Sequence, residues 1–258
     1  MTQKLRSITS RLAPAVLIGA LLLIWQLCSD LRVVPKFMLP SPTDVLSAFV
    51  SDFPALLLHA RVSLSEAFLG LSTAMILSFA VAYLMDRFRF VRDSVYPLLI
   101  LTQTIPTVAI APLLVLWLGY GILPKVVLIV ITCFFPMTIG LLSGFASADG
   151  DLINLMRAMG ATKGQIFRYV KLPSSAEQFF SGLRISASYS VVGAVIAEWL
   201  GGFEGLGVYM MRVKKSYSFD KMFAVILLIS IISLLLIKAV DLIKKRSMPW
   251  VELHPADN

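Results

Sequence analysis

Six long apolar stretches recur along this chain, and they constrain its fold more than any other feature of the sequence. A helix needs about 20 apolar residues to cross a bilayer, whose interior offers no water to hydrogen-bond an open backbone. We therefore expect each stretch to close its own hydrogen bonds as a transmembrane helix. The predicted spans are residues 13–29, 62–86, 95–118, 123–145, 180–199 and 222–243. The sequence thus predicts an all-α integral membrane protein.

The composition agrees with this fold class. Of the 258 residues, 58% are hydrophobic and only 15% are charged, whereas about 25% are charged in soluble domains. Six crossings use about 120 residues, so we expect a single transmembrane domain over residues 1–258. The first stretch resembles a secretory signal in following basic residues. Bulky Trp25 and Leu27 stand where a cleavage site needs small side chains, so we interpret it as a span.

The distribution of Lys and Arg predicts the orientation of the chain. With the N-terminus in the cytoplasm, the inner segments carry 15 Lys and Arg and the outer segments carry 8. This excess matches the positive-inside rule and predicts both termini inside. The outer basic cluster from Arg212 to Lys221 opposes the trend, either as a solvated loop or as a functional patch. No basic run carries interleaved aromatic residues, so the net charge of +8 does not indicate nucleic-acid binding.

The third predicted span is interrupted by polar residues and prolines. Gln103, Thr104, Thr107, Pro106 and Pro112 break its apolar run. Proline removes a backbone hydrogen bond and kinks or breaks a helix. The freed carbonyl and amide groups need water or a solute as partners, which favours a cavity wall, although a packing kink explains the prolines equally well. Gln103, Thr104 and Pro106 are therefore candidates for a translocation path.

Charged residues lie near the ends of the predicted spans. Glu198 closes the fifth span beside Gly201 and Gly202, either as a polar gate residue or as an ordinary acidic residue that reaches the interface. Glu66 and Lys238 are expected to extend their charged ends toward water. A secondary carrier would place acidic residues midway through its spans, so this alternative is disfavoured.

The segment between the fourth and fifth spans has a helical pattern of its own. An apolar stripe at spacings of three and four is formed by Leu152, Leu155, Met156 and Met159. Gly160 follows, and a glycine that adopts positive φ commonly ends a helix. We therefore predict a short amphipathic helix that ends at Gly160.

A second short helix is predicted over residues 163–170. Thr162 and Gln165 have the spacing of a capping box, and Pro173 is expected to stop the helix. Such a pair of helices either lies on the membrane surface, with its basic residues at the lipid headgroups, or docks its apolar stripe into a groove of a partner protein.

The same segment carries a family resemblance. The residues Asn154-Leu155-Met156-Arg157-Ala158-Met159-Gly160, followed by Val170-Lys171-Leu172-Pro173, resemble the EAA loop of inner-membrane permeases of binding-protein-dependent ABC importers. The spacing from the glycine to Leu-Pro fits that family without a gap. One departure is that Asn154, Leu155 and Met156 replace the Glu-Ala-Ala that names the loop.

Further motifs extend the resemblance over nearly the whole chain. They are Leu39-Pro40-Ser41-Pro42, Gln103-Thr104-Ile105-Pro106, Trp117-Leu118-Gly119-Tyr120-Gly121 and Gly205-Leu206-Gly207. These are similar to the branch that imports sulfonates, taurine, nitrate and thiamine-precursor pyrimidines. Residues 197–202 and 214–218 look most like the thiamine-precursor group.

The resemblance implies the partners and the functional residues. Two copies would form the solute pathway in the bacterial inner membrane, with an extracytoplasmic solute-binding protein outside and a cytoplasmic ABC ATPase dimer inside. Residues 149–173, called the coupling segment below, would contact the ATPase. The contacting residues implied are Leu152, Leu155, Met156, Met159, Gly160, Ala161, Leu172 and Pro173.

No catalytic or cofactor site is expected in this chain. The phosphate-binding pattern Gly-x-x-x-x-Gly-Lys-Ser/Thr is absent from the sequence, so ATP is expected to bind to a partner chain. His59 and His254 lie far apart and are expected to be ordinary solvated residues. Cys28 and Cys133 lie in apolar stretches and suggest small buried hydrophobic residues rather than a disulfide or a metal site.

Overall fold

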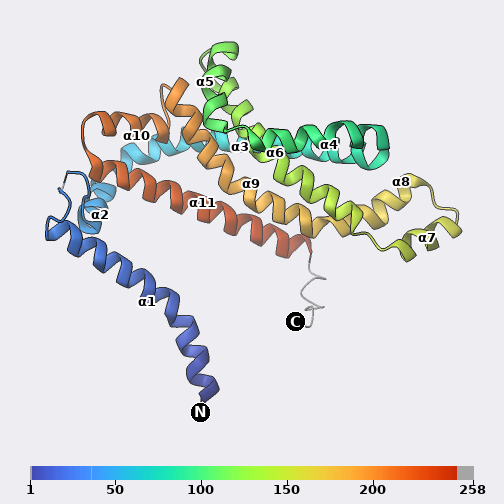
Figure 1. The fold of residues 1–258 in the computed structure, drawn as a ribbon, viewed down its shortest axis with the longest axis horizontal. Helices are drawn as coiled ribbons and strands as arrows, with labels where there is room; N and C mark the ends of the chain where they lie inside the picture. Colours follow the sequence, from blue (N-terminus) through green and yellow to red (C-terminus); the bar gives the residue numbers. More distant parts are fainter. Residues whose placement is uncertain (1, 36, 249–258) are drawn as a thin grey trace. The chain divides into compact units, whose positions relative to one another are not determined.

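The computed structural model describes residues 2–35 and 37–248, and every regular element in these ranges is helical. The all-α prediction is therefore confirmed for this part of the chain. In order, the helices are α1 (Thr2–Asp30), α2 (Pro42–Ser51), α3 (Phe53–Arg87), α4 (Arg89–Thr104), α5 (Thr107–Leu118), α6 (Ile122–Ala146), α7 (Gly150–Ala158), α8 (Lys163–Ile166), the π-helical turn η1 (Phe167–Lys171), α9 (Leu172–Gly201), α10 (Leu206–Lys215) and α11 (Phe219–Ser247) (Figure 1).

Five helical segments in the described residues are long and apolar enough to cross a membrane. They are Ala13–Asp30, Phe53–Arg87, Ile122–Ala146, Lys163–Gly201 and Phe219–Ser247. The helices α4 and α5 together give a sixth span if the pair is counted as one. The six-span prediction thus depends on how this pair meets the bilayer.

The α4–α5 pair is bent by 102° rather than gently kinked. Ile105 is extended, with φ −89° and ψ 121°, and Pro106 stands at the N-cap of α5. Proline disfavours helical backbone in the residue before it, which explains the break at Ile105. Pro112 lies inside α5 and does not interrupt the helix.

The described chain forms two compact units. One comprises residues up to His59 together with Tyr209–Leu228. Its core contains Val45, Ala48 and Ala224, with the Trp25 and Phe223 rings 5.7 Å apart. His59 lies in α3, where it is buried and 5.2 Å from the Tyr209 ring, so the prediction of an ordinary solvated residue was wrong. His254 lies outside the described residues.

The other unit comprises Ala60–Val208 and the residues from Ile229 onward. Within it α6 and α9 lie side by side (Figure 1). A Cβ on Gly144 would come within 2.4 Å of the Ser175 Cα atom, so the absence of a side chain permits this close approach. The Ser186 hydroxyl donates to the Cys133 carbonyl at 3.0 Å, and Cys133 is buried. This tightly packed pair supports the functional regions described next.

Candidate functional site

The first helix of the coupling segment ends where the sequence predicts. The Asp149 carboxylate caps α7 by accepting from the backbone N–H of Asp151 at 2.8 Å. At the other end Gly160 has φ +82°, as predicted, and the Ala161 N–H donates to the Met156 carbonyl at 2.9 Å. A left-handed residue with this hydrogen bond is the usual way to end a helix with a tight turn.

The second helix begins as predicted and ends differently. Thr162 and Gln165 form the capping box, with the Thr162 N–H donating to Gln165 Oε1 at 2.7 Å. The prediction that Pro173 stops this helix was wrong, because α8 continues through η1 into α9. In η1 the Leu172 N–H donates to the Phe167 carbonyl, a π-type bond. Pro173 then falls in the first turn of α9, where its missing N–H is tolerated.

The inner side of the coupling segment is anchored to its own unit. Phe167 packs between Tyr83 and Phe145, at centroid distances of 4.8 Å and 5.1 Å. Lys171 Nζ lies 2.6 Å from Asp86 Oδ1, which ties η1 to α3. These contacts hold η1 against α3 and α6 and do not use the apolar stripe of α7.

Most of the apolar stripe is left uncovered by the described residues of this chain. Leu152, Leu155 and Met159 are 44%, 57% and 75% exposed, and Met156 is half-buried. Of the other residues implied by the resemblance, Ala161 and Leu172 are half-buried and Pro173 is exposed. The stripe therefore presents large apolar side chains to whatever adjoins α7.

A cavity of about 210 Å³ lies where α4, α5, α6 and α9 meet. Gln103 lines it, together with Thr102, Thr107, Thr132 and Tyr189. Thr104 and Pro106 are outside its lining; the Thr104 hydroxyl donates to the Leu101 carbonyl of its own helix at 2.8 Å. The wall offers hydroxyl and amide groups, and no charged residue is among its described lining.

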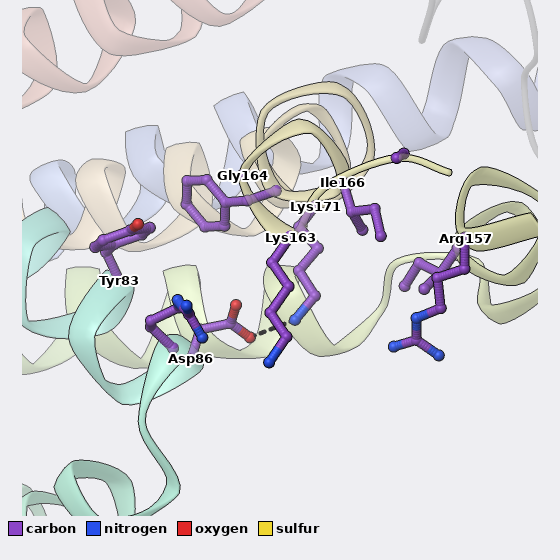
Figure 2. Close-up of a pocket in the computed structure, with 11 residues that line it drawn as sticks. Tyr83, Asp86, Arg157, Lys163, Gly164, Ile166 and Lys171 are labelled. Carbon is purple, nitrogen blue, oxygen red and sulfur yellow. Dashed lines mark hydrogen bonds and ion pairs between the residues drawn. The ribbon is translucent and has the colours of Figure 1, made fainter. Parts of the chain in front are cut away.

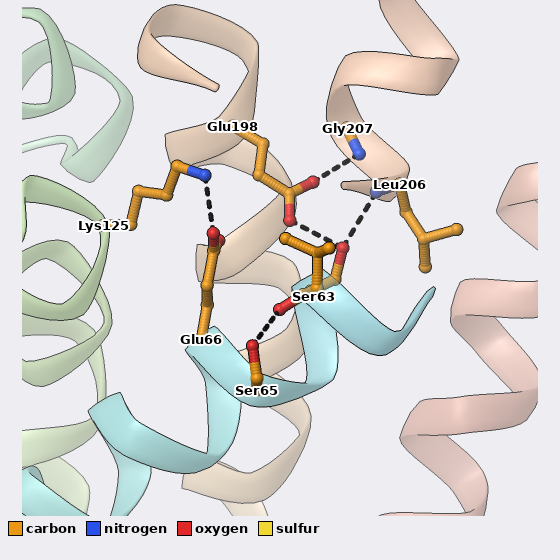
Figure 3. Close-up of polar contacts among 8 residues, drawn as sticks. Ser63, Ser65, Glu66, Lys125, Glu198, Leu206 and Gly207 are labelled. Atoms are coloured by element: carbon orange, nitrogen blue, oxygen red, sulfur yellow. Dashed lines mark hydrogen bonds and ion pairs between the residues drawn. The ribbon is translucent and has the colours of Figure 1, made fainter. Parts of the chain in front are cut away.

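Glu198 is buried in a hydrogen-bonded network instead of reaching the interface. Its side chain is 1% exposed, and Oε1 accepts from the Ser63 hydroxyl at 2.6 Å. Oε2 accepts from the Gly207 N–H at 2.5 Å, while the Leu206 N–H donates to the Ser63 hydroxyl at 2.8 Å (Figure 3). The carboxylate thus fastens the start of α10 to the C-terminal end of α9 and to α3.

A buried ion pair lies beside this carboxylate. Lys125 Nζ on α6 is 2.5 Å from Glu66 Oε1 on α3, and the two residues are 5% and 3% exposed (Figure 3). The expectation that Glu66 extends toward water was wrong, because its partner is inside the protein. We call Ser63, Glu66, Lys125 and Glu198 the buried charge network.

Sequence reasoning missed this ion pair, although one signal pointed to it. Ser63, Glu66, Ala67 and Ala74 recur at helical spacing and are all buried. A face of small residues on a membrane helix is typical of close helix packing. A charged residue on such a face needs a partner from a neighbouring helix.

Comparison with known proteins agrees with these features. The family model for the inner membrane component of binding-protein-dependent transport systems matches residues 68–252. A probable ABC transporter permease protein of Haemophilus influenzae is 35% identical, over 89% of this chain and 94% of that relative. The formylaminopyrimidine transport permease protein ThiX of Halalkalibacterium halodurans is 34% identical, over 93% of this chain and 96% of that relative.

A solved structure shares the fold. The inward-facing MetNI methionine ABC transporter has a TM-score of 0.65, covering 75% of this chain and 97% of the matched chain at 20% identity. The family match covers more than half of the sequence, and both relatives are matched over nearly their full length. The chain belongs to the family of binding-protein-dependent transport system inner membrane components and is a multi-pass permease of an ABC importer.

Proposed function

We propose that two copies of this chain form the solute pathway of the importer and that each docks its coupling segment on a cytoplasmic ATPase dimer. The observation that carries this proposal is the stripe of Leu152, Leu155 and Met159, which is exposed on and beside α7, while η1 of the same segment is tied to α3. An exposed apolar stripe on a short helix fits the helix-in-groove mode of protein recognition.

The proposal includes an orientation and a source of energy. Both termini and the coupling segment face the cytoplasm, in agreement with the excess of Lys and Arg in the segments assigned to that side. ATP binds to and is hydrolysed by the partner. Closure of the ATPase dimer would move the docked segments and shift the helices between inward-facing and outward-facing states, provided that it binds the two states with different affinity.

The solute is proposed to be a small polar organic molecule, with a thiamine-precursor pyrimidine as the best candidate. The uncharged cavity that Gln103 lines provides amide and hydroxyl groups, which suit a neutral hydrogen-bonding heterocycle. The similarity to ThiX supports the same class. Sulfonates, taurine and nitrate are anions, for which a cationic group in the wall would be favourable.

Docking is tested by co-purification. The full-length permease is expressed with its ATPase, and the amount of ATPase captured per permease is measured in detergent. We expect Leu155→Ser combined with Met159→Ser to lower capture about tenfold or more, because both side chains would be buried in the groove. Both are exposed here, so thermal unfolding of the permease should not change.

A matched control separates docking from general loss of apolar surface. Tyr169 is 63% exposed in η1 and lies outside the stripe. Tyr169→Ser should capture as much ATPase as the wild type. Capture by the double variant at the wild-type level would refute docking through this stripe.

The solute class is tested on the partner that delivers the solute. Binding of a formylaminopyrimidine, taurine and nitrate to the cognate solute-binding protein is measured by calorimetry. Uptake of the pyrimidine into vesicles that contain the whole importer should then depend on ATP. If the solute-binding protein binds only taurine or nitrate, the transported solute is an anion and not a pyrimidine.

A further inference from the structure

A cationic pocket lies behind the coupling segment. It has a volume of about 490 Å³ and is bounded by the end of α3 on one side and by α7, α8 and η1 on the other. Four basic side chains line it, from Arg87, Arg157, Lys163 and Lys171, against a single carboxylate among its described lining, that of Asp86. The pocket is thus strongly positive.

The charges of the pocket are unevenly satisfied. Lys171 pairs with Asp86 at 2.6 Å. The Arg157 guanidinium donates to the Asn154 side chain at 3.3 Å, which leaves its positive charge uncompensated. Within the described part of the chain, neither Arg157 nor Lys163 forms an ion pair with a carboxylate. Several cations gathered around one space repel each other, and an anion placed among them relieves that repulsion.

The geometry brings donors from separate elements around one space. Lys163 and Lys171 extend toward Asp86, and Arg157 faces them from α7 across the pocket (Figure 2). Arginine offers a planar fork of N–H donors and lysine a compact charge, a combination that suits the oxygens of phosphate groups. The volume exceeds that of a bare inorganic ion, so it also accommodates an organic group attached to the phosphate.

We propose that this pocket binds the phosphate group of an anionic ligand, with Arg157 and Lys163 as its principal contacts. Two sources share this chemistry. One is the headgroup of an anionic phospholipid, since the candidate span of α3 ends at Arg87 and exposed Phe88 and Phe90 follow it, as aromatic residues do at a membrane interface. The other is a phosphate compound dissolved in the cytoplasm.

Binding there would link α3 to the coupling segment. Arg157 belongs to α7 and Lys163 to α8, so a phosphate that contacts both would bridge the turn at Gly160. The effect of this bridge on the ATPase rests on the proposed function. The binding does not, because it is measured on the permease alone.

The test removes two charges from the pocket and two from elsewhere. Arg157→Gln combined with Lys163→Gln alters exposed side chains and should leave folding intact. The control is Lys214→Gln combined with Lys215→Gln, which changes the net charge equally on exposed positions of α10. Native mass spectrometry of the full-length permease measures retention of phosphatidylglycerol against phosphatidylethanolamine. Thermal-shift titration with inorganic pyrophosphate, in lipid-free detergent, measures the soluble source.

We expect the wild type and the control to bind anionic phosphate about tenfold more tightly than the pocket variant. Selective loss of phosphatidylglycerol from the pocket variant supports the lipid source. Selective loss of the pyrophosphate response supports the soluble source. If the variant binds both probes like the control, or if the wild type binds neither, the proposal is overturned. Loss of ATPase capture without any loss of anion binding would assign the cations to an acidic protein surface instead.

Discussion

The buried charge network and the coupling segment both include residues of α9, near its two ends, and their side chains are arranged in opposite ways. Glu198 is 26 residues beyond Leu172 on α9, about 40 Å along the helix axis. In the network the charged groups point inward and are paired with other helices of the chain. In the coupling segment the apolar side chains of Leu152, Leu155 and Met159 are exposed and are not covered by the described residues.

The difference indicates which region is complete in one chain. A buried charge without a partner is costly in the membrane, so the network must be satisfied before the helices can pack. An exposed apolar stripe does not destabilise the folded chain, because the unfolded chain exposes the same side chains, and a partner that removes the stripe from water gains free energy. Substitutions in the network should therefore change stability, whereas substitutions in the coupling segment should change assembly.

The largest effect is expected at Lys125. Lys125→Met leaves the Glu66 carboxylate buried without its cation and should lower the free energy of unfolding by about 3–5 kcal/mol. The measurement is thermal or denaturant unfolding in detergent. Adding Glu66→Leu should restore most of the loss, because an apolar pair replaces the ion pair. If the single variant is as stable as the wild type, the ion pair does not stabilise the fold, and the network and the coupling segment do not differ in their effect on stability.

The hydroxyl of Ser63 should matter to a smaller extent. Ser63→Ala removes the donor to Glu198 and the acceptor for the Leu206 N–H, which should cost about 1–3 kcal/mol. Ser65 is a matched control, since it is exposed and donates to the Val62 carbonyl of its own helix at 2.7 Å. Equal losses from Ser63→Ala and Ser65→Ala would mean that the network adds nothing beyond local helix bonding.

Gly160 tests the prediction that substitutions in the coupling segment change assembly. Val in this left-handed position is strained by about 1–3 kcal/mol, and the strain falls on an exposed turn that can open locally. Gly160→Val should thus reduce ATPase capture while the unfolding midpoint stays near that of the wild type. Gly160→Asn, which tolerates positive φ, should retain capture. A large drop in the unfolding midpoint without loss of capture would show that Gly160 contributes to stability and not to assembly with the ATPase.

The smallest effect is expected at Asp52, a paired carboxylate that lies outside the candidate spans and is partly open to water. Burial raises the pKa of Asp52, but the hydrogen bond from Tyr209 and the pair with Lys221 at 3.0 Å lower it below its ordinary value of 3.8. Because the pKa is lower in the folded state, the ionised carboxylate stabilises the fold at pH values above the pKa of Asp52 in the unfolded chain. This contribution is lost as the pH falls below about 4. Asp52→Asn should therefore flatten the decline of the unfolding midpoint between about pH 5 and about pH 3.

Tyr209 supplies a check at high pH. Burial and the hydrogen bond to Asp52 raise the pKa of Tyr209. The protonated phenol therefore stabilises the fold at pH values below the ordinary tyrosine pKa, and this contribution is lost as the pH rises above about 10. Tyr209→Phe should remove part of the alkaline decline in the unfolding midpoint. Identical pH profiles for wild type and both variants would mean that Asp52 and Tyr209 are equally solvated in the unfolded and folded states.

Local features of the coupling segment could be predicted from the sequence. The capping box joins residues three positions apart, and the turn at Gly160 depends on the backbone freedom of one residue. Both follow from chemistry that neighbours along the chain supply. Pro173 shows the limit of such rules, because the π-helical turn before it absorbs the missing hydrogen bond and the helix continues.

The network could not be predicted in the same way. Glu66 and Lys125 are 59 positions apart, and Ser63 and Glu198 are 135 apart. Each residue alone is compatible with a side chain that reaches water at a helix end. The small-residue face of α3 indicates that some helix packs there, but only the packing of α3, α6 and α9 determines which residues meet Glu66 and Ser63.

The uninterrupted helical run from Lys163 to Gly201 determines how force would travel through this unit. It contains 39 residues, or about 58 Å of axis. No loop separates the coupling segment from the rest of this run. A tilt imposed at Lys163 would therefore also displace the other end, at Gly201, as in a stiff rod. A tilt of only about 5° would displace the far end by about 5 Å, nearly one helical turn.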